Sequence, residues 1–383
     1  MRSPLRLFAA ACMVAVGAGL ITWIYAISLT SKNATERDFI EYWAAEQQLA
    51  RGANPYDVGA ILRLEQAAGM DGSSPKVSFS PPVALFFALP LGYVDAKTGL
   101  IAWLLLLLAC VGATVWALWF LYRRPQSRFH LLAFAFPPTL SCLMAGQLGI
   151  FFFLAGVLFF WLHLTRPWLA GAALAVCALK PHLFLPCVVV LLLWSARRRD
   201  FRVVGGFVAA LLLGSGLTLC LDRQVWTEYA QMMQSTRVLD VYMPTLSMSL
   251  RFLIDRSAKW LEFVPEAAGC AWAVWFYWSR RDRWVWTREG MLLLLVSALC
   301  TPYLWFSDEA MLFPAILAGI YASEKSPRAW ILLGVITAAS LIGVFWAIPL
   351  PSPFYLWTVP AWFAWYLYAT RADQSVRTAT ATL

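Results

Sequence analysis

The chain has 383 residues, of which 61% are hydrophobic and only 13% charged, and its formal net charge is +9. Soluble domains carry about 25% charged residues, so this composition, with a mean hydropathy of +0.66, excludes a water-soluble globular protein. The arginines stand in short clusters between apolar stretches and are not gathered on one polar module. The positive charge therefore indicates contact with anionic membrane lipids and no nucleic-acid partner.

Apolar stretches long enough to cross a hydrocarbon core, which takes about 20 helical residues, recur from Leu7 to Thr370. They are continuous and do not alternate, so helices and not barrel strands are expected. Spans are predicted at residues 7–29, 99–122, 129–142, 148–164, 168–180, 181–195, 203–221, 263–279, 289–306, 309–322, 329–348 and 354–370. The fold class is an all-α polytopic membrane protein of about 11–13 transmembrane helices in one integral membrane domain, residues 1–383.

Residues 7–29 are interpreted as the first span and not as a cleaved signal, because many further apolar runs follow. Residues 82–94 are short and flanked by prolines, and they suit either a half-helix or a re-entrant segment. Two predicted pairs are broken by polar residues, at Gly146-Gln147 and at Lys180-Pro181. Discontinuous helices of this kind build binding sites at membrane depth.

The arginine clusters fix the predicted orientation, because positively charged loops face the cytoplasm. The clusters lie at residues 123–128, 197–202, 280–283, 325–328 and 371–377. With these inside, both termini are cytoplasmic and two polar stretches, residues 31–80 and 222–262, face outward. Each contains an amphipathic helical pattern that is rich in aromatic residues, so we expect these helices to lie on the membrane surface.

Asp38 is the first candidate for chemistry. It follows the first span closely, and a helix that begins near Thr35 places Asp38 and Tyr42 one turn apart on one face. A carboxylate there is suited to act as a general base toward a hydroxyl delivered beside the bilayer. Alternatively, Thr35 and Asp38 form a capping box, and their spacing does not distinguish the two roles.

Lys180 and Gln147 are the candidates at the two helix breaks. Lys180 precedes Pro181-His182 within an apolar sequence, where a lysine and a histidine suit a phosphate or pyrophosphate. The alternative is that Lys180 extends from the end of a span toward the membrane surface. Gln147 either contacts a ligand or bonds two helices together.

A late stretch, Thr301 to Glu309, places Asp308 at an external helix boundary, where it caps a helix or lines a cavity. No nucleotide-binding or soluble-hydrolase motif is present. The three histidines are widely separated and the cysteines lie in apolar stretches, so no metal site and no cofactor is expected.

Several of these strings together resemble glycosyltransferase family 87. They are Arg37-Asp38-Phe39-x-x-Tyr42-Trp43, Asn54-Pro55-Tyr56-Asp57, Phe79-Ser80-Pro81-Pro82, Gly146-Gln147, Leu179-Lys180-Pro181 and Thr301-Pro302-Tyr303 with Asp308. The resemblance runs from about residue 37 to residue 315. Phe79, His182 and Ser307 depart from the residues that are common in the family, which leaves the sugar and the acceptor open.

The resemblance implies a GT-C fold and an inverting enzyme of the inner (plasma) membrane. Such an enzyme moves a sugar, mannose or arabinofuranose, from a polyprenyl-phosphate donor to a lipid or glycan acceptor on the outer side. The family's base maps onto Asp38 and its Lys-Pro lysine onto Lys180. Arg37, Tyr42, Gln147, His182, Tyr303 and Asp308 are the further residues expected to bind substrate.

A transporter or lipid flippase is the rival hypothesis, since these proteins also use broken helices and buried ionisable residues. Such folds often contain two corresponding halves. No internal repeat is evident here, and the first outer loop has no counterpart in the second half. A non-catalytic scaffold does not explain isolated ionisable groups at costly positions.

Overall fold

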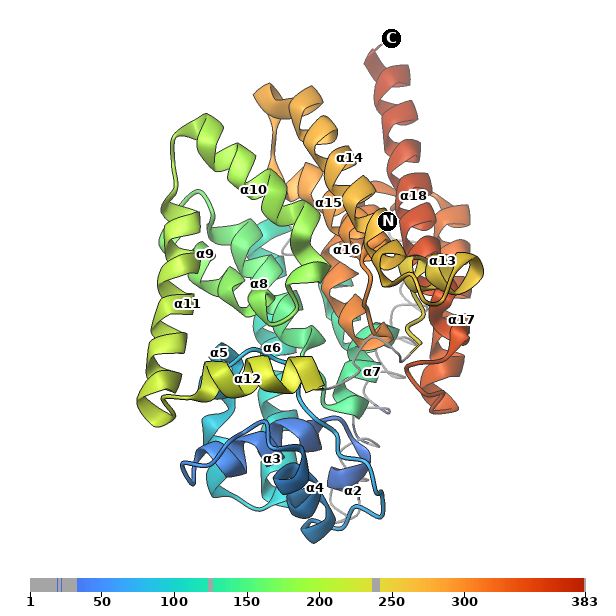
Figure 1. Cartoon of the computed structure of the whole chain (residues 1–383). Helices are drawn as coiled ribbons and strands as arrows, with labels where there is room; N and C mark the ends of the chain where they lie inside the picture. Colours follow the sequence, from blue (N-terminus) through green and yellow to red (C-terminus); the bar gives the residue numbers. More distant parts are fainter. Residues whose placement is uncertain (1–18, 20–21, 23–32, 123–126, 236–241, 382–383) are drawn as a thin grey trace.

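The computed structural model describes residues 19, 22, 33–122, 127–235 and 242–381, and within these ranges it contains helices and no strand. The predicted span at residues 7–29 lies almost wholly outside the described residues. The other apolar runs form helices that stand side by side along one long direction (Figure 1). The protein is an all-α polytopic membrane protein, as its composition predicts.

The first outer region folds as short helices at one end of the molecule (Figure 1). These are α2 (Asn33–Glu36), α3 (Phe39–Leu49) and α4 (Val58–Ala67). The region is followed by α5 (Val83–Ala88), which continues into the 3-10 helix η1 (Leu89–Tyr93). The ambiguous stretch at residues 82–94 thus forms α5 and η1, and a short link joins η1 to the long helix α6 (Ala96–Tyr122).

The middle of the chain supplies broken helices. In order, these are η2 (Phe129–Ala135), α7 (Pro137–Ala145), α8 (Gly149–Leu162), α9 (Pro167–Leu174), η3 (Ala175–Leu179), η4 (Pro181–Phe184), α10 (Leu185–Arg198) and α11 (Arg202–Leu221). Both predicted breaks are present, because α7 ends before Gly146 and η3 ends before Lys180.

The second outer region contains α12 (Val225–Ser235), α13 (Leu246–Ile254) and η6 (Lys259–Phe263). α12 lies across the neighbouring long helices (Figure 1). The remaining helices are α14 (Val264–Arg280), η7 (Arg281–Arg283), α15 (Trp286–Cys300), η8 (Phe306–Leu312), α16 (Phe313–Ala322), α17 (Pro327–Phe345), η9 (Pro353–Trp357) and α18 (Thr358–Ala381). The predicted span at residues 289–306 is wrong at its end, because the helix stops at Cys300 and an irregular segment follows.

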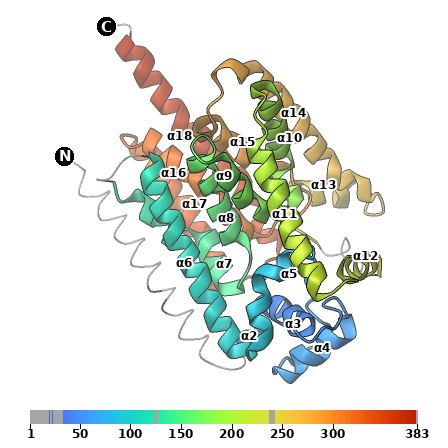
Figure 2. The same ribbon diagram turned by 90° about the vertical axis from the view of Figure 1, so that its left-hand side faces the viewer.

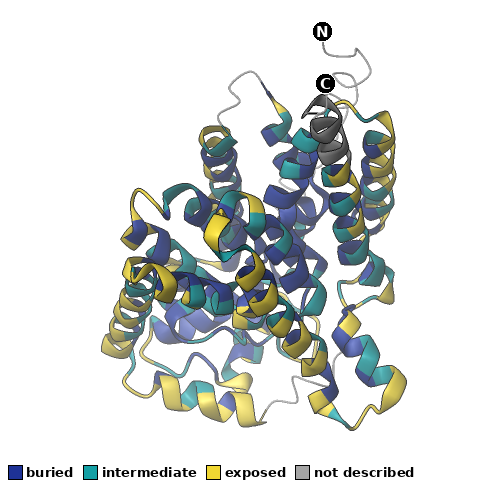
Figure 3. Cartoon of the chain, turned by 90° about the horizontal axis from the view of Figure 1, so that it is seen from above, coloured by how far each residue is buried: buried dark blue, intermediate teal, exposed yellow. Residues whose placement is uncertain are grey.

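Four helices of the described residues are long and apolar enough to cross a membrane: Ala96–Tyr122, Pro181–Arg198, Arg202–Leu221 and Pro327–Phe345. Most of the other predicted spans correspond to shorter helices or to helices joined end to end. Buried residues lie toward the centre of the bundle and exposed residues toward its rim (Figure 3). Large apolar side chains are exposed on α6, α11 and α17, for example Leu105, Leu212 and Val335, as expected of helices that face lipid.

Two arginine-rich connections meet at the end opposite to α3 and α4 (Figure 1). Arg197 at the end of α10 forms an ion pair with Asp282 in the turn between α14 and α15. Both charged turns therefore lie at one end of the bundle, with α3 and α4 at the other. That the charged end faces the cytoplasm stays a prediction from the charge pattern.

One prediction about the first outer region is wrong. Helix α3 does not lie on the membrane surface, because residues 39, 40 and 42–49 are all buried. Its aromatic residues pack inside the protein, and the indole of Trp43 donates a hydrogen bond of 2.9 Å to the carbonyl of Val94. Helices α4, α5 and α6 and the 3-10 helix η1 pack around α3, so the side that was predicted to meet lipid meets protein.

Candidate active site

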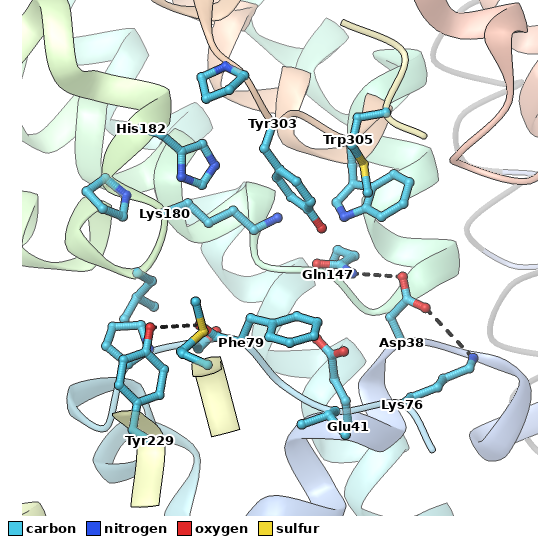
Figure 4. Close-up of a pocket in the computed structure, with 18 of the residues that line it drawn as sticks. Asp38, Glu41, Lys76, Phe79, Gln147, Lys180, His182, Tyr229, Tyr303 and Trp305 are labelled. Carbon is cyan, nitrogen blue, oxygen red and sulfur yellow. Dashed lines mark hydrogen bonds and ion pairs between the residues drawn. The ribbon is translucent and has the colours of Figure 1, made fainter. Parts of the chain in front are cut away.

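Asp38 lies at the start of α3 and faces a large cavity. It occupies the N-cap position, but its side chain makes no capping bond. Instead the amide of Gln147 donates a hydrogen bond of 2.7 Å to Asp38 Oδ2, and Lys76 Nζ lies 3.8 Å from Asp38 Oδ1. The carboxylate is thus held by two tertiary contacts and not by its own helix (Figure 4).

The side chain of Gln147 also bonds a second residue of α3. The hydroxyl of Tyr42 donates a hydrogen bond of 3.0 Å to Gln147 Oε1, while Gln147 Nε2 bonds Asp38. Gln147 therefore bonds the link between α7 and α8 to the start of α3, and it also lines the cavity. Its contact with a ligand stays a prediction. The chain of bonds from Tyr42 through Gln147 fixes the direction in which the Asp38 carboxylate points.

The break before Gln147 depends on close backbone packing. Gly146 ends α7 in the left-handed conformation, with φ of +71°, and a Cβ there would lie 2.8 Å from Cβ of Phe39. The indole of Trp103 donates a hydrogen bond of 2.8 Å to the Gly146 carbonyl. Glycine therefore permits both the turn and the approach of α3, which brings Gln147 next to Asp38.

Lys180 lies on the opposite side of the cavity (Figure 4). Its ammonium donates to both carboxylate oxygens of Asp308, at 2.9 and 2.8 Å, and it lies 5.6 Å from the ring centre of Tyr303. Lys180 does not extend to the membrane surface, because it is tied to this buried carboxylate. Asp308 also accepts a hydrogen bond of 3.1 Å from the backbone of Trp305, so it fixes the first turn of η8 as well.

The cavity has a volume of about 1070 Å³ and brings together six of the eight predicted site residues. These are Asp38, Tyr42, Gln147, Lys180, His182 and Tyr303. Its lining comes from the first outer region, the two helix breaks, the second outer region and the segment after α15. Residues that are far apart in the sequence therefore face one space.

Arg37 and Asp308 do not line this cavity. The guanidinium of Arg37 donates a hydrogen bond of 3.2 Å to the carbonyl of Leu143 in α7, and Asp308 is fully buried beneath Lys180. Both residues hold neighbours in place, and neither is arranged for direct contact with a substrate in the cavity.

Comparison of the sequence with known protein families gives one match. Residues 79–302 match glycosyltransferase family 87, and this segment is more than half of the chain. The chain belongs to glycosyltransferase family 87. No curated protein and no solved structure matches the chain.

Family 87 consists of GT-C type membrane glycosyltransferases, and this chain is a membrane glycosyltransferase. The matched segment contains Gln147, Lys180 and His182, whereas Asp38 and Tyr42 precede it and Tyr303 follows it directly. The roles of all these residues therefore depend on the geometry of the cavity and not on the family match.

Among the residues that line this family 87 cavity, the sequence did not point to Lys76, Glu41 or Trp305. Lys76 contacts Asp38 from an irregular loop, and its own backbone N–H donates to both oxygens of Glu65 in α4, at 3.2 and 3.1 Å. Glu41 follows Asp38 by one turn of the same helix, and Trp305 precedes η8. Helical spacing offered a signal for Glu41, but nothing local to Lys76 indicates that it faces Asp38.

Glu41 gives the cavity a second carboxyl group beside Asp38 (Figure 4). Burial, and next the negative charge of Asp38, raise the pKa of Glu41 to about 8. Glu41 is therefore mostly neutral at pH 7, and it can donate a hydrogen bond into the cavity. The cavity thus holds the carboxyl groups of Asp38 and Glu41 close to the ammonium groups of Lys76 and Lys180.

Proposed function

We propose that this family 87 enzyme transfers mannose or arabinofuranose from a polyprenyl-phosphate donor to a lipid or glycan acceptor on the outer side of the inner membrane. The observation that carries the proposal is that Asp38 and Lys180 line one cavity from opposite sides. A base and a cation so placed suit a reaction in which a hydroxyl loses a proton and a phosphate leaves.

In the proposed reaction the acceptor hydroxyl attacks the anomeric carbon while the bond from that carbon to the phosphate oxygen breaks. The hydroxyl proton passes to Asp38, and the bonding electrons leave with the polyprenyl phosphate. Attack in line with the departing phosphate inverts the anomeric configuration. Gln147 donates to Oδ2 of Asp38 at 2.7 Å, whereas Oδ1 has only the longer contact of 3.8 Å with Lys76 Nζ, so we propose that Oδ1 receives the proton.

Lys180 is the residue proposed to stabilise the negative charge that develops on the leaving phosphate. An ammonium group has three N–H donors, and Asp308 accepts from it with both oxygens, so one donor remains for a ligand. Tyr303 and His182 stand beside it with ring centres 5.5 Å apart, and His182 Nε2 has no hydrogen-bond partner among the described residues. These groups are suited to bind the phosphate or the sugar next to it.

The proposal is tested by incubating the purified enzyme in lipid vesicles with a panel of polyprenyl-phosphate sugars and an envelope lipid extract. The expected result is a glycosylated product with inverted anomeric configuration, observed by nuclear magnetic resonance, together with released polyprenyl phosphate. Movement of intact sugar lipid between leaflets, with no transfer from any donor, would contradict the proposal and support the transporter hypothesis.

A further inference from the structure

A second, smaller cavity adjoins the large one. It has a volume of about 320 Å³, and its wall comes mainly from α3, α5, α6, η3 and the start of α8. We call it the side groove. Tyr42, Ser80 and Leu179 line both the side groove and the large cavity, so the two spaces meet there.

The side groove has a predominantly apolar wall that reaches the surface of the bundle. Phe87 of α5 is 58% exposed and Leu106 of α6 is 45% exposed, and both line the groove. α5 lies between α6 and α11 (Figure 2), and α6 and α11 are two of the helices that can cross the membrane. An apolar groove that opens between such helices is reached from the lipid phase.

Glu46 is the acidic residue in this wall. Its side chain is 1% exposed, and neither carboxyl oxygen has a hydrogen-bond partner among the residues that the structure describes. Burial raises the pKa of Glu46 well above its ordinary value, so the group is a neutral acid with one donor and free acceptor capacity. An unpaired buried carboxyl group costs free energy unless something in the groove bonds to it.

The charges of the two cavities differ. No lysine or arginine lines the side groove, whereas Lys76 and Lys180 line the large cavity. A phosphate next to Glu46 would have no cation to pair with. The anionic donor therefore suits the large cavity, and the side groove suits an uncharged molecule.

Helix α3 connects the two spaces through one row of side chains. Asp38, Tyr42 and Glu46 follow one another at intervals of four residues, so they lie along one face of the helix. With a rise of 1.5 Å per residue, Glu46 lies about 12 Å from Asp38 along the axis. A molecule that lies along this row can contact Glu46 and still present a hydroxyl group to Asp38.

We infer that the side groove binds the acceptor, and that the acceptor is an uncharged lipid whose chain lies between α5 and α6 and whose hydroxyl or amide group bonds Glu46. The inference rests on the proposed transfer reaction, and it selects a membrane lipid over a soluble glycan as the acceptor.

The test uses the full-length enzyme in lipid nanodiscs without any sugar donor. The probes are a monoacylglycerol and a lysophosphatidic acid that carry the same photoreactive acyl chain, and labelled peptides are identified by mass spectrometry. We expect the uncharged probe to label α5 and α6 about fivefold more than the anionic probe. Glu46→Leu should lower this labelling about fivefold, whereas Glu46→Gln should retain it.

Two further variants complete the design. Leu85→Trp fills the groove without removing the carboxyl group, so it should block labelling even if Glu46→Leu fails to fold. Glu266→Leu is the matched control, because Glu266 is also a buried glutamate with an unpartnered oxygen among the described residues but lines neither cavity. It should label as wild type does.

Equal or stronger labelling by the anionic probe would overturn the inference, and so would wild-type labelling of a folded Glu46→Leu or Leu85→Trp variant. Because labelling needs no sugar transfer, the two proposals fail separately. An active enzyme whose groove is not labelled contradicts only the acceptor site. An inactive enzyme with the expected labelling contradicts only the transfer reaction.

Discussion

The two carboxyl groups at the start of α3 differ in their surroundings although they are one helical turn apart. Asp38 is held by the Gln147 amide and lies near the Lys76 ammonium, whereas Glu41 is buried and its pKa is raised to about 8. Both residues carry carboxyl groups, so their different surroundings, and not their residue types, suit Asp38 to the role of base and Glu41 to that of neutral acid.

This difference predicts a pH dependence. Below about pH 8 Glu41 is neutral, and above it the group ionises and places a second negative charge in the cavity that receives the anionic donor. Transfer by the wild type should therefore fall as the pH rises past about 8, mainly through a higher KM for the donor. Glu41→Gln cannot ionise and should lack this decline, which pH profiles of the two proteins would reveal.

The sign of the effect on stability is the same. The pKa of Glu41 in the folded protein lies above its ordinary value, so the contribution of this group to stability is fully present at acidic pH and is lost as the pH rises toward about 8. Sugar transfer by the wild type that does not fall above about pH 8, or an identical fall in Glu41→Gln, would contradict the role of Glu41.

At the scale of elements, the cavity depends on helix ends that meet without intervening side chains. Gly149 begins α8, and a Cβ at this position would overlap the carbonyl oxygen of Ser307 in η8. The adjacent residue of η8 is Asp308, which holds Lys180. The close contact between Gly149 and η8 therefore helps to position Asp308, and through it Lys180.

Gly149→Ala should consequently displace η8. We expect a loss of roughly 1–3 kcal/mol in the free energy of unfolding, typical of overpacking, and a lower rate of sugar transfer. Gly156→Ala is the matched control on the same helix, because a Cβ at Gly156 meets no atom within 4 Å. Thermal unfolding and transfer assays would compare the two, and equal behaviour would show that the contact with Ser307 does not matter.

At the scale of the whole molecule, the arginine-rich turns lie at one end and the cavity with its short helices at the other. If the charged turns face the cytoplasm, the cavity opens outward. A cysteine introduced at Asp71, in the first outer region, should then react with a membrane-impermeant maleimide in intact cells. A cysteine at Asp282 should react only after the cells are permeabilised, and the reverse pattern would invert the proposed topology.

The sequence was sufficient for the fold class and for the two helix breaks. Long apolar runs determine a helical membrane protein, and Gly146 and Lys180-Pro181 interrupt helices through local backbone chemistry. The end of α15 was predicted wrongly because apolar residues continue past Cys300 although the helix does not.

The parts that the sequence missed depend on tertiary packing. Apolar residues at helical spacing in α3 predicted a surface helix, but spacing cannot show which helices cover it. Lys76 contacts Asp38 from a loop whose backbone is bonded to the Glu65 carboxyl group in α4. Likewise, the pairing of Lys180 with Asp308 joins two breaks that lie far apart in the sequence.

The most direct test of the account is sugar transfer in lipid vesicles by wild type, Asp38→Asn and Asp57→Asn. Asp57 lies in the same outer region, but its side chain caps α4 by accepting a hydrogen bond from the Ala60 backbone, and it does not line the cavity. We predict that Asp38→Asn folds and that its rate of sugar transfer falls at least about 100-fold, as expected for loss of a general base. The rate of Asp57→Asn should remain close to that of wild type. Full transfer by a folded Asp38→Asn enzyme would contradict the assignment of Asp38 as the base.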